Sequence, residues 1–331
     1  SNVAIGVSAL QANTTASNNT AVGYVAGYSN TTGTTNTFIG RYAGYLNTTA
    51  SNNTMVGSSS GQNNTTGAQN TAVGTDSLIS NTTANNNTAL GYQAGYSNTT
   101  GTELTFVGYA AGYNNTTGAY NTFLGRTSGY YTTTGSANIG IGYSALVTNS
   151  SGANNTAIGM QALQANTTAS NNTAVGYQAG YSNTTGYNNA AFGNQAFYYN
   201  TTGALNTALG DSSLLANTTG SFNTAVGRSA LGSNTTASNN TALGYQALYD
   251  NTTGGSNTAV GTYSLANNTT GYDNAAFGYS ALTANTTGIV NSAFGDYALD
   301  ANTSGNYNVA MGKDALGSNT TASNNTAVGY Q

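Results

Sequence analysis

The side chains best able to do acid–base or metal chemistry in this sequence are eight acids, because the chain has no His and no Cys. The absence of His and Cys excludes nucleophile–His arrangements and the usual zinc sites. Asp296 and Asp300 are close in sequence, as a glycosidase carboxylate pair could be, but the sequence indicates no cleft between them. None of the acids recurs at a fixed interval, as a repeated calcium turn requires. We therefore expect no catalytic residue, no metal and no cofactor, and a solvated surface role for Asp76, Glu103, Asp211, Asp250, Asp273, Asp296, Asp300 and Asp314.

A second chemically suggestive pattern is Asn-x-Thr or Asn-x-Ser, the acceptor for N-glycosylation, which occurs eighteen times at one position of a seventeen-residue repeat. Glycans on a column of Asn residues about 4.8 Å apart would be crowded, so we do not favour extensive modification. O-linked sugars on the neighbouring Thr residues are an open alternative. The possible glycosylation sites include Asn13, Asn30, Asn98, Asn166, Asn183, Asn234, Asn285 and Asn319.

The repeat itself is marked by a glycine at every seventeenth position, twenty times, with no insertion or deletion from Gly6 to Gly329. With this glycine numbered position 7, the consensus is x-x-Asn-Thr-Ala-Val-Gly-Tyr-x-Ala-Leu-x-x-Asn-Thr-Thr-Gly. Position 3 is Asn in every copy except Leu104, and position 14 is Asn in every copy except Thr132. A period this strict indicates one supersecondary unit stacked about twenty times.

Each repeat has too many Gly, Asn and Thr residues for helical coils. The Asn-Thr-Ala-Val-Gly segment predicts a short strand closed by a turn residue, and Asn-Thr-Thr-Gly predicts a second extended piece or a corner. Two short strands and two turns fit a repeat of this length. The sequence therefore predicts an all-β fold, a parallel β-solenoid or β-roll of about twenty coils, forming a single uninterrupted array over residues 1–331; its handedness stays open.

In such a stack each residue lies above the one seventeen positions earlier, so the Asn columns should form ladders in which each amide donates to the next. The repeated glycine should need a positive φ or a close backbone approach. We expect these structural roles for Gly6, Gly23, Gly176, Gly329, Asn19, Asn172 and Asn183.

The few charged residues also follow the register. All four basic residues are at position 8, and two of them have an acid one coil earlier at the same position. Opposite charges on neighbouring strands stabilise a sheet by a few tenths to about 1 kcal/mol. We expect inter-coil ion pairs between Asp211 and Arg228 and between Asp296 and Lys313.

Packing supports the same register. Position 5 is usually Ala, but it is Phe or Met in four copies, and in those copies position 11 is Gly instead of Leu. Such paired volume changes are expected in a close-packed core. Positions 5 and 11 should therefore be neighbours in the coils of Phe38 and Gly44, Met55 and Gly61, Phe106 and Gly112, and Phe123 and Gly129.

Positions 5 and 6 are adjacent and almost always apolar, although adjacent strand residues point to opposite faces. One face can be the inside of the coil, and the other then needs a covering surface. A bulge that turns both residues inward is the alternative. We favour a homo-oligomer, most of all a trimer, with an end-to-end filament also open.

Only 4% of residues are charged and the net charge is −4, so no basic patch for nucleic acid is expected. No apolar run is long enough for membrane insertion in this segment. The chain begins and ends inside a repeat, and solenoids need atypical capping coils. We therefore expect a slice of a longer fibrous protein, with caps and anchor outside it.

Segments such as Asn172-Thr-Ala-Val-Gly-Tyr-Gln-Ala-Gly-Tyr-Ser-Asn-Thr-Thr-Gly186 and Asn2-Val-Ala-Ile-Gly-Val-Ser-Ala-Leu10 resemble the head repeats of trimeric autotransporter adhesins. They are also similar to the shaft repeats of phage tail fibres and of related bacterial surface proteins. The resemblance implies a trimeric β-roll on a cell surface or virion appendage, used for attachment or reach.

We thus expect a non-enzymatic extracellular structural fibre or adhesin segment, whose partners are copies of itself and possible host or environmental surface glycans. The alternative is a ligand-binding solenoid for ice or glycan, which would use the Thr, Asn and Tyr ladders.

Overall fold

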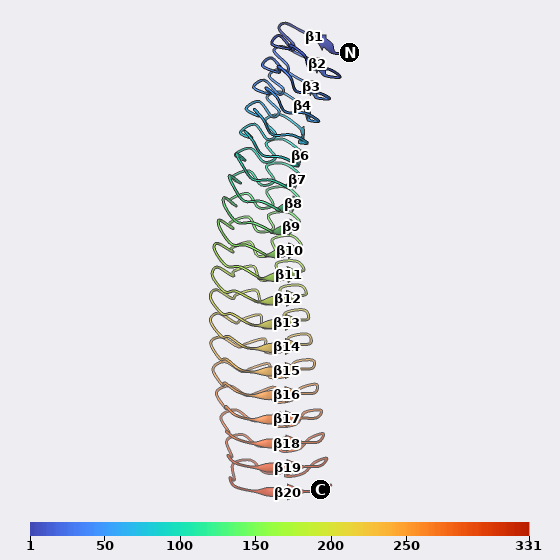
Figure 1. Cartoon of the computed structure of the whole chain (residues 1–331). Coiled ribbons are helices and arrows are strands. Elements are labelled where there is room, and N and C mark those ends of the chain that lie inside the picture. The colour runs from blue at the N-terminus through green and yellow to red at the C-terminus, as the bar shows by residue number, and fades with distance from the viewer. Residues whose placement is uncertain (331) are drawn as a thin grey trace. The chain divides into compact units, whose positions relative to one another are not determined.

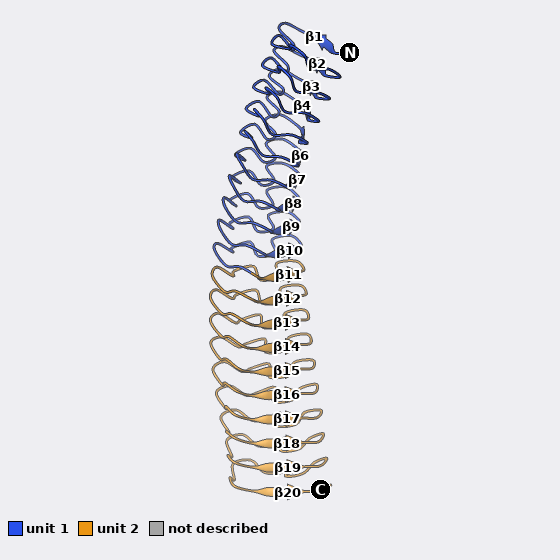
Figure 2. Ribbon diagram, viewed as in Figure 1, with its two compact units in different colours: residues 1–170 blue, residues 171–331 orange. Residues whose placement is uncertain are grey.

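The computed structural model describes residues 1–330 and shows an all-β parallel β-solenoid of about twenty coils, with one coil for each sequence repeat (Figure 1). The predicted fold class is confirmed. By its contacts the chain divides into two compact units, Ser1–Ser170 and Asn171–Gln331, which we describe separately (Figure 2). Among the described residues, no helix has the length and hydrophobicity to cross a membrane.

Every coil contributes one three-residue strand, and every strand is centred on position 5. In the first unit the strands are β1 (Val3–Ile5), β2 (Thr20–Val22), β3 (Thr37–Ile39), β4 (Thr54–Val56), β5 (Thr71–Val73), β6 (Thr88–Leu90), β7 (Thr105–Val107), β8 (Thr122–Leu124), β9 (Ile139–Ile141) and β10 (Thr156–Ile158). In the second unit they are β11 (Thr173–Val175), β12 (Ala190–Phe192), β13 (Thr207–Leu209), β14 (Thr224–Val226), β15 (Thr241–Leu243), β16 (Thr258–Val260), β17 (Ala275–Phe277), β18 (Ser292–Phe294), β19 (Val309–Met311) and β20 (Thr326–Val328).

Strand pairing within each unit is parallel and in register with the repeat. In β13 and β14, for example, Thr207 pairs with Thr224 and Ala208 pairs with Ala225. Thr, Val, Ile and Leu at positions 4 and 6 suit these strands because β-branched and bulky side chains pack well on a pleated surface. The predicted superposition of residues one repeat apart is therefore confirmed.

Of the two alternatives for the Asn-Thr-Thr-Gly segment, the structure shows the corner and not a second strand, so each coil has one strand. The hydrogen bonds of the corner converge on one atom: the carbonyl of Thr48 accepts from the amide of Thr31 at 2.9 Å, the amide of Thr32 at 3.3 Å and the Thr31 hydroxyl at 3.1 Å. Two successive amides directed to one carbonyl cannot belong to an alternating strand ladder. The corner is instead held by two backbone amides and one threonine hydroxyl that donate to one carbonyl of the next coil, and this arrangement is repeated from coil to coil.

The repeated glycine has the backbone predicted for it. Gly23 has a φ of 140°, and an added Cβ would lie 2.6 Å from the carbonyl oxygen of Gly40 in the next coil. Both the torsion and the close approach therefore require glycine at position 7. The same environment surrounds Gly6 and Gly176, whereas Gly329 shares the positive φ but has no atom within 4 Å of an added Cβ.

Three further positions of the repeat, 2, 9 and 11, are left-handed without being restricted to glycine. In one coil these are Asn239 with a φ of 64°, Gln246 with 51° and Leu248 with 54°. A left-handed conformation costs a residue with a Cβ about 1–2 kcal/mol. The neighbouring coils must supply this energy, since the torsions persist only where surrounding contacts over-determine them.

The core of each coil is narrow and is filled chiefly by Ala at position 5, Ala or Ser at position 10, and Leu or Gly at position 11. Where position 5 is large, it occupies the space of the missing leucine: an added Cβ at Gly112 would lie 2.7 Å from the ring of Phe106. The predicted contact between positions 5 and 11 is confirmed. The contact also reaches one coil further, because an added Cβ at Gly95 would lie 2.9 Å from the same ring.

Candidate interaction surfaces and polar ladders

The Asn column at position 14 forms the amide ladder that the sequence predicted. Asn251 donates through Nδ2 to Oδ1 of Asn234 at 3.0 Å and to the carbonyl of Gly254 at 2.9 Å, and its own Oδ1 accepts from Asn268 at 2.8 Å. All three Asn side chains are fully buried. Each amide is therefore satisfied inside the fold, which explains the column without any ligand.

The Asn column at position 3 works differently from the prediction. Asn240 donates through Nδ2 to the carbonyl of Gly254 at 3.0 Å, while its Oδ1 accepts from the backbone amide of Asn257 at 2.9 Å. This ladder runs chiefly from side chain to backbone rather than from amide to amide. Both Asn columns donate to the same position 17 carbonyl, so they lock that corner together.

The two ladders are interrupted in neighbouring coils, by Leu104 at position 3 and Thr132 at position 14. Leu104 has no side-chain oxygen that could accept a hydrogen bond from the backbone amide of Asn121 in the next coil. The buried hydroxyl of Thr132 has no hydrogen-bond partner. Asn121 bridges the two columns, donating through Nδ2 to Oδ1 of Asn115 at 3.2 Å. An unsatisfied buried polar group costs about 1–3 kcal/mol, so this is a weak point of the first unit.

Most candidate glycosylation sites carry their acceptor nitrogen inside these ladders. Nδ2 of Asn234 donates to Asn217 at 2.8 Å and to the carbonyl of Ala237 at 3.1 Å. A glycan attached there in the folded chain would displace both bonds. Asn13 and Asn319 are partly exposed, whereas the buried sites are Asn30, Asn98, Asn166, Asn183, Asn234 and Asn285.

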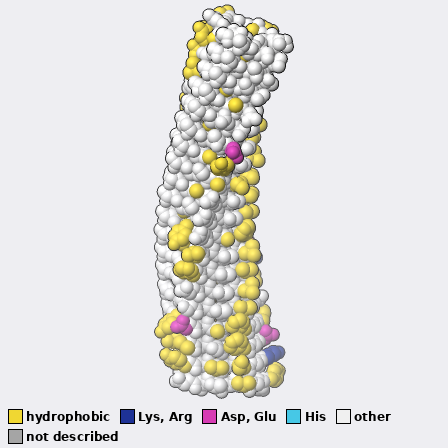
Figure 3. All heavy atoms as spheres, in the orientation of Figure 1, with side chains coloured by type: hydrophobic (Ala, Val, Ile, Leu, Met, Phe, Trp, Pro, Cys, Tyr) yellow, Lys and Arg dark blue, Asp and Glu magenta, His cyan; other side chains and the backbone are white. Residues whose placement is uncertain are grey.

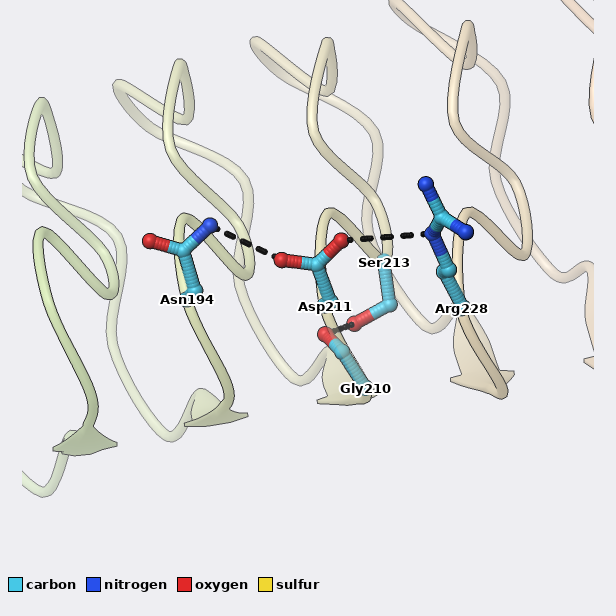
Figure 4. Close-up of polar contacts among 5 residues, drawn as sticks. All are labelled: Asn194, Gly210, Asp211, Ser213 and Arg228. Atoms are coloured by element: carbon cyan, nitrogen blue, oxygen red, sulfur yellow. Dashed lines mark hydrogen bonds and ion pairs between the residues drawn. The ribbon is translucent and has the colours of Figure 1, made fainter.

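Polar side chains at position 8 form a chain along three coils of the second unit. Oδ2 of Asp211 lies 3.5 Å from Nε of Arg228, and its Oδ1 accepts from Nδ2 of Asn194 at 2.8 Å (Figure 4). The predicted pair of Asp211 and Arg228 is therefore formed. Both side chains are well exposed, so its contribution to stability is at most about 1 kcal/mol.

The second predicted pair, Asp296 with Lys313, is not formed in the part of the chain that the structure describes. Oδ1 of Asp296 accepts from the backbone amide of Tyr279 at 2.9 Å, which directs the carboxylate toward the preceding coil. Nζ of Lys313 lies 6.0 Å from the ring centroid of Tyr330 in the following coil. The two side chains thus lean away from each other, and each has another partner.

Position 8 also carries tyrosines that contact basic groups. The guanidinium carbon of Arg126 lies 5.7 Å from the ring centroids of both Tyr109 and Tyr143, within cation–π range. At position 12 the rings of Tyr96, Tyr113 and Tyr130 stack, with centroids 4.8 and 4.9 Å apart. Burial and the two neighbouring tyrosines raise the pKa of Tyr113.

The outer face of the strands exposes a column of apolar side chains at position 6. In β15, Ala242 is fully buried and Leu243 is 47% exposed, and the same contrast holds for Ala208 and Leu209 in β13. The strand therefore turns position 5 inward and position 6 outward, and no bulge hides both. Figure 3 shows hydrophobic side chains following one another in a line on the face drawn, with few charges among them.

The eight acidic residues are spread over seven coils, and only Asp296 and Asp300 share one. Among residues 1–330, no group of three or more acidic side chains could hold a metal ion. Asp300 lies in the coil of β18, where burial raises the pKa of its carboxyl and nearby Asp314 adds to the rise. The raised pKa follows from desolvation and like charge.

A second-order repeat, that is, a longer repeat superimposed on the seventeen-residue one, was not predicted from the sequence, because the shorter period conceals it. The segment Asn-Thr-Thr-Ala-(Ser/Asn)-Asn-Asn-Thr-Ala-(Val/Leu)-Gly-Tyr occurs five times, and a sixth copy at 47–58 differs by Met55 and Ser58. Successive copies among the five are separated alternately by four and by five coils. They place an exposed tyrosine two residues after the end of a strand, at Tyr24, Tyr92, Tyr177, Tyr245 and Tyr330.

No protein-family model matches this chain, and no curated protein matches it. Its function must therefore be argued from the surfaces described above.

Proposed function

We propose that this chain is a non-enzymatic structural segment of an extracellular fibre or adhesin, and that it assembles with copies of itself, as a trimer, through the outer face of its strands. The observation that carries the proposal is the column of exposed apolar side chains at position 6, represented by Leu209 and Leu243. Long apolar stripes are rare on soluble monomers, because exposed apolar surface favours association.

The chemistry of this face suits a second copy of the chain. Position 6 is always apolar, and position 8, two residues further on, is tyrosine in eight of the twenty coils and charged in six, with four basic and two acidic residues. Tyr side chains are favoured at interfaces, because they combine a large apolar ring with a polar tip. A copy packed on the position 6 column would meet no charged side chain in that column. Burial of its aliphatic surface would contribute about 25 cal/mol per Å².

The second-order repeat supports the same proposal. In the second unit Tyr177, Tyr245 and Tyr330 recur after four and then five coils, or about 19–24 Å at an inter-strand spacing of about 4.8 Å. A partner with the same spacing could meet all three at once, which raises the strength of binding through multivalency. Another copy of this chain has the same spacing, because it has the same sequence.

Placement outside the cell or on a virion rests on the resemblance to adhesin heads and tail-fibre shafts. The ladders are consistent with such a role: buried Asn side chains such as Asn251 bond from coil to coil and need no disulfide or metal. A fibre of this kind gains reach from added coils, without a new fold for each one.

Glycan binding is the second candidate, favoured by the exposed rings at position 8, such as Tyr177 and Tyr245. The position 12 column suits it less, because the ring faces of Tyr113 are covered by Tyr96 and Tyr130. Ice binding has less support, since the hydroxyls at position 15 are used by the next coil, as in the bond from Thr252 to Thr269 at 3.0 Å. A glycan array and a thermal-hysteresis measurement separate these alternatives from a purely structural role.

The proposal is tested by comparing Leu243→Glu with Thr253→Glu. Both residues belong to the coil of β15 and both are exposed, but only Leu243 lies on the sheet face. We expect Leu243→Glu to shift the chain toward monomer in sedimentation velocity and Thr253→Glu to leave its assembly unchanged. Equal behaviour of the two variants would exclude the sheet face as the assembly surface.

A further inference from the structure

The tyrosines at position 12 of three successive coils form the most regular aromatic stack in the first unit. The rings of Tyr96 and Tyr113 lie 4.8 Å apart with 6° between their planes, and those of Tyr113 and Tyr130 lie 4.9 Å apart with 5° between them. All three side chains are half-buried, so their rings keep a solvent-exposed rim. The stack is therefore regularly spaced and still reachable by a small solute.

The separation of reactive atoms follows from this geometry. The rings come from the same position of successive coils and are nearly parallel, so each ring atom lies at about the centroid distance from its counterpart. The carbons ortho to the two hydroxyls thus face each other across neighbouring coils, without any chain rearrangement to bring them together. A half-exposed ring has room to tilt toward its neighbour.

The composition directs oxidation to tyrosine. The chain has 25 Tyr, no Cys and no Trp, and only three Met. Cys thiolates and Met thioethers are the usual first targets of oxidants. In this chain Cys is absent and Met is scarce. One-electron oxidation therefore falls mainly on phenol rings.

We propose that the column Tyr96–Tyr113–Tyr130 is a site of oxidative cross-linking, where a one-electron oxidant joins neighbouring rings as dityrosine. Each of two phenols loses one electron to the oxidant and one proton to water, which gives two phenoxyl radicals. A carbon–carbon bond forms between their ortho carbons, and the hydrogen on each of these carbons moves to the phenol oxygen. The pair loses two electrons and two protons in total, and the oxidant takes up the two electrons.

The consequence is a covalent bond between adjacent coils. Each link between residues 96 and 113, or 113 and 130, closes a loop one coil long in the unfolded chain. Such a closure stabilises the fold by restricting the unfolded state, as a disulfide does. In a chain without cysteine, it is the available way to fasten coils that otherwise associate only through non-covalent ladders.

The test is photo-oxidation of the purified full chain by ruthenium tris-bipyridine with persulfate, followed by peptic digestion and mass spectrometry. We expect peptides joining Tyr96 to Tyr113 and Tyr113 to Tyr130, each two hydrogen atoms lighter than the sum of its parts. Their yield should be independent of protein concentration and several-fold higher in the folded chain than in guanidinium. The cross-linked chain should also unfold at a higher temperature.

Tyr113→Phe removes the middle phenol and should abolish both links. Tyr120→Phe, on an exposed tyrosine outside the stack, should leave their yield unchanged. If Tyr113→Phe does not fold, Tyr96→Phe replaces it and should leave only the link between residues 113 and 130. Equal yields in folded and denatured chains, links at unstacked tyrosines instead, or no dityrosine at all would each overturn the proposal.

Discussion

The phenyl ring of Phe106 occupies the space beside Gly112, where an added Cβ would lie 2.7 Å from it. The same ring also approaches Gly95 in the preceding coil. The sequence follows this geometry: wherever position 5 is Phe or Met, position 11 is Gly in that coil and in the one before it. A large residue at position 5 therefore requires glycine at position 11 in two coils and not one.

This relationship predicts a non-additive set of substitutions around Ala242, Leu231 and Leu248, which are all fully buried. Leu231→Gly with Leu248→Gly should lower the free energy of unfolding by more than about 5 kcal/mol, because two cavities are created. Adding Ala242→Phe should recover at least half of that loss, since the ring fills both spaces. Equilibrium denaturation measures both variants. The variant with Ala242→Phe and Leu248→Gly, which keeps Leu231, should remain less stable than the unmodified chain. A free energy of unfolding equal to that of the unmodified chain would contradict the two-coil contact.

Gly176 tests the requirement for glycine at position 7. It has a φ of 141°, and an added Cβ would lie 2.6 Å from the carbonyl carbon of Gly193. Gly176→Val should destabilise the chain by about 3 kcal/mol or more, through backbone strain and steric overlap. Gly255→Val is the matched control, since Gly255 has an ordinary φ and lies at position 1, where large residues such as Tyr187 and Ile289 occur. Equal thermal midpoints for the two variants would refute the glycine argument.

Thr132 offers a gain of stability. Thr132→Asn should restore the position 14 ladder and satisfy a buried position that now has an orphan hydroxyl, which raises the free energy of unfolding by about 1–2 kcal/mol. Thr134→Asn, at the exposed position 16 of the same coil, should change stability by less than about 0.5 kcal/mol. Thermal unfolding of both variants decides the matter. A destabilised Thr132→Asn chain would show that the interrupted ladder has already repacked around Asn121.

Asp300 predicts a pH dependence of definite sign. Burial and Asp314 raise the pKa of its carboxyl in the folded chain, so the charged form is disfavoured by folding. At neutral pH the charged carboxylate of Asp300 therefore lowers the free energy of unfolding. This penalty disappears as the pH falls through the raised pKa of the folded chain toward the pKa of the unfolded chain. Asp300→Asn should raise the thermal midpoint at pH 7 and make it less dependent on pH. An unchanged pH profile would contradict the assignment.

Much of the fold could be predicted from the sequence, because Gly recurs without a break, Asn recurs with one exception in each column, and each residue type has few structural roles. The stacking register, the inward position 5 and the amide ladder of Asn251 all follow from the period. The left-handed torsions at Gln246 and Leu248 could not be predicted, because those positions accept many residue types and their backbone is set by neighbouring coils. The pair of Asp296 and Lys313 failed for a related reason: the period places two Cα atoms together, but not the ends of flexible side chains.

The candidate interaction surface was less accessible to prediction. Alternation along the strand indicated an outward apolar column, which the exposure of Leu209 and Leu243 confirms. The four- and five-coil spacing of Tyr24 and its counterparts is visible in the sequence, but only after the shorter period is set aside. The identity of the covering partner stays a prediction, since a surface alone does not specify what binds it.

Sedimentation equilibrium of the unmodified chain over a range of concentrations tests the central proposal, self-association through the sheet face, most directly. We expect a species with three times the single-chain mass of 33.2 kDa, which persists on dilution because the buried face is apolar. A mass equal to one chain at every concentration would contradict the account.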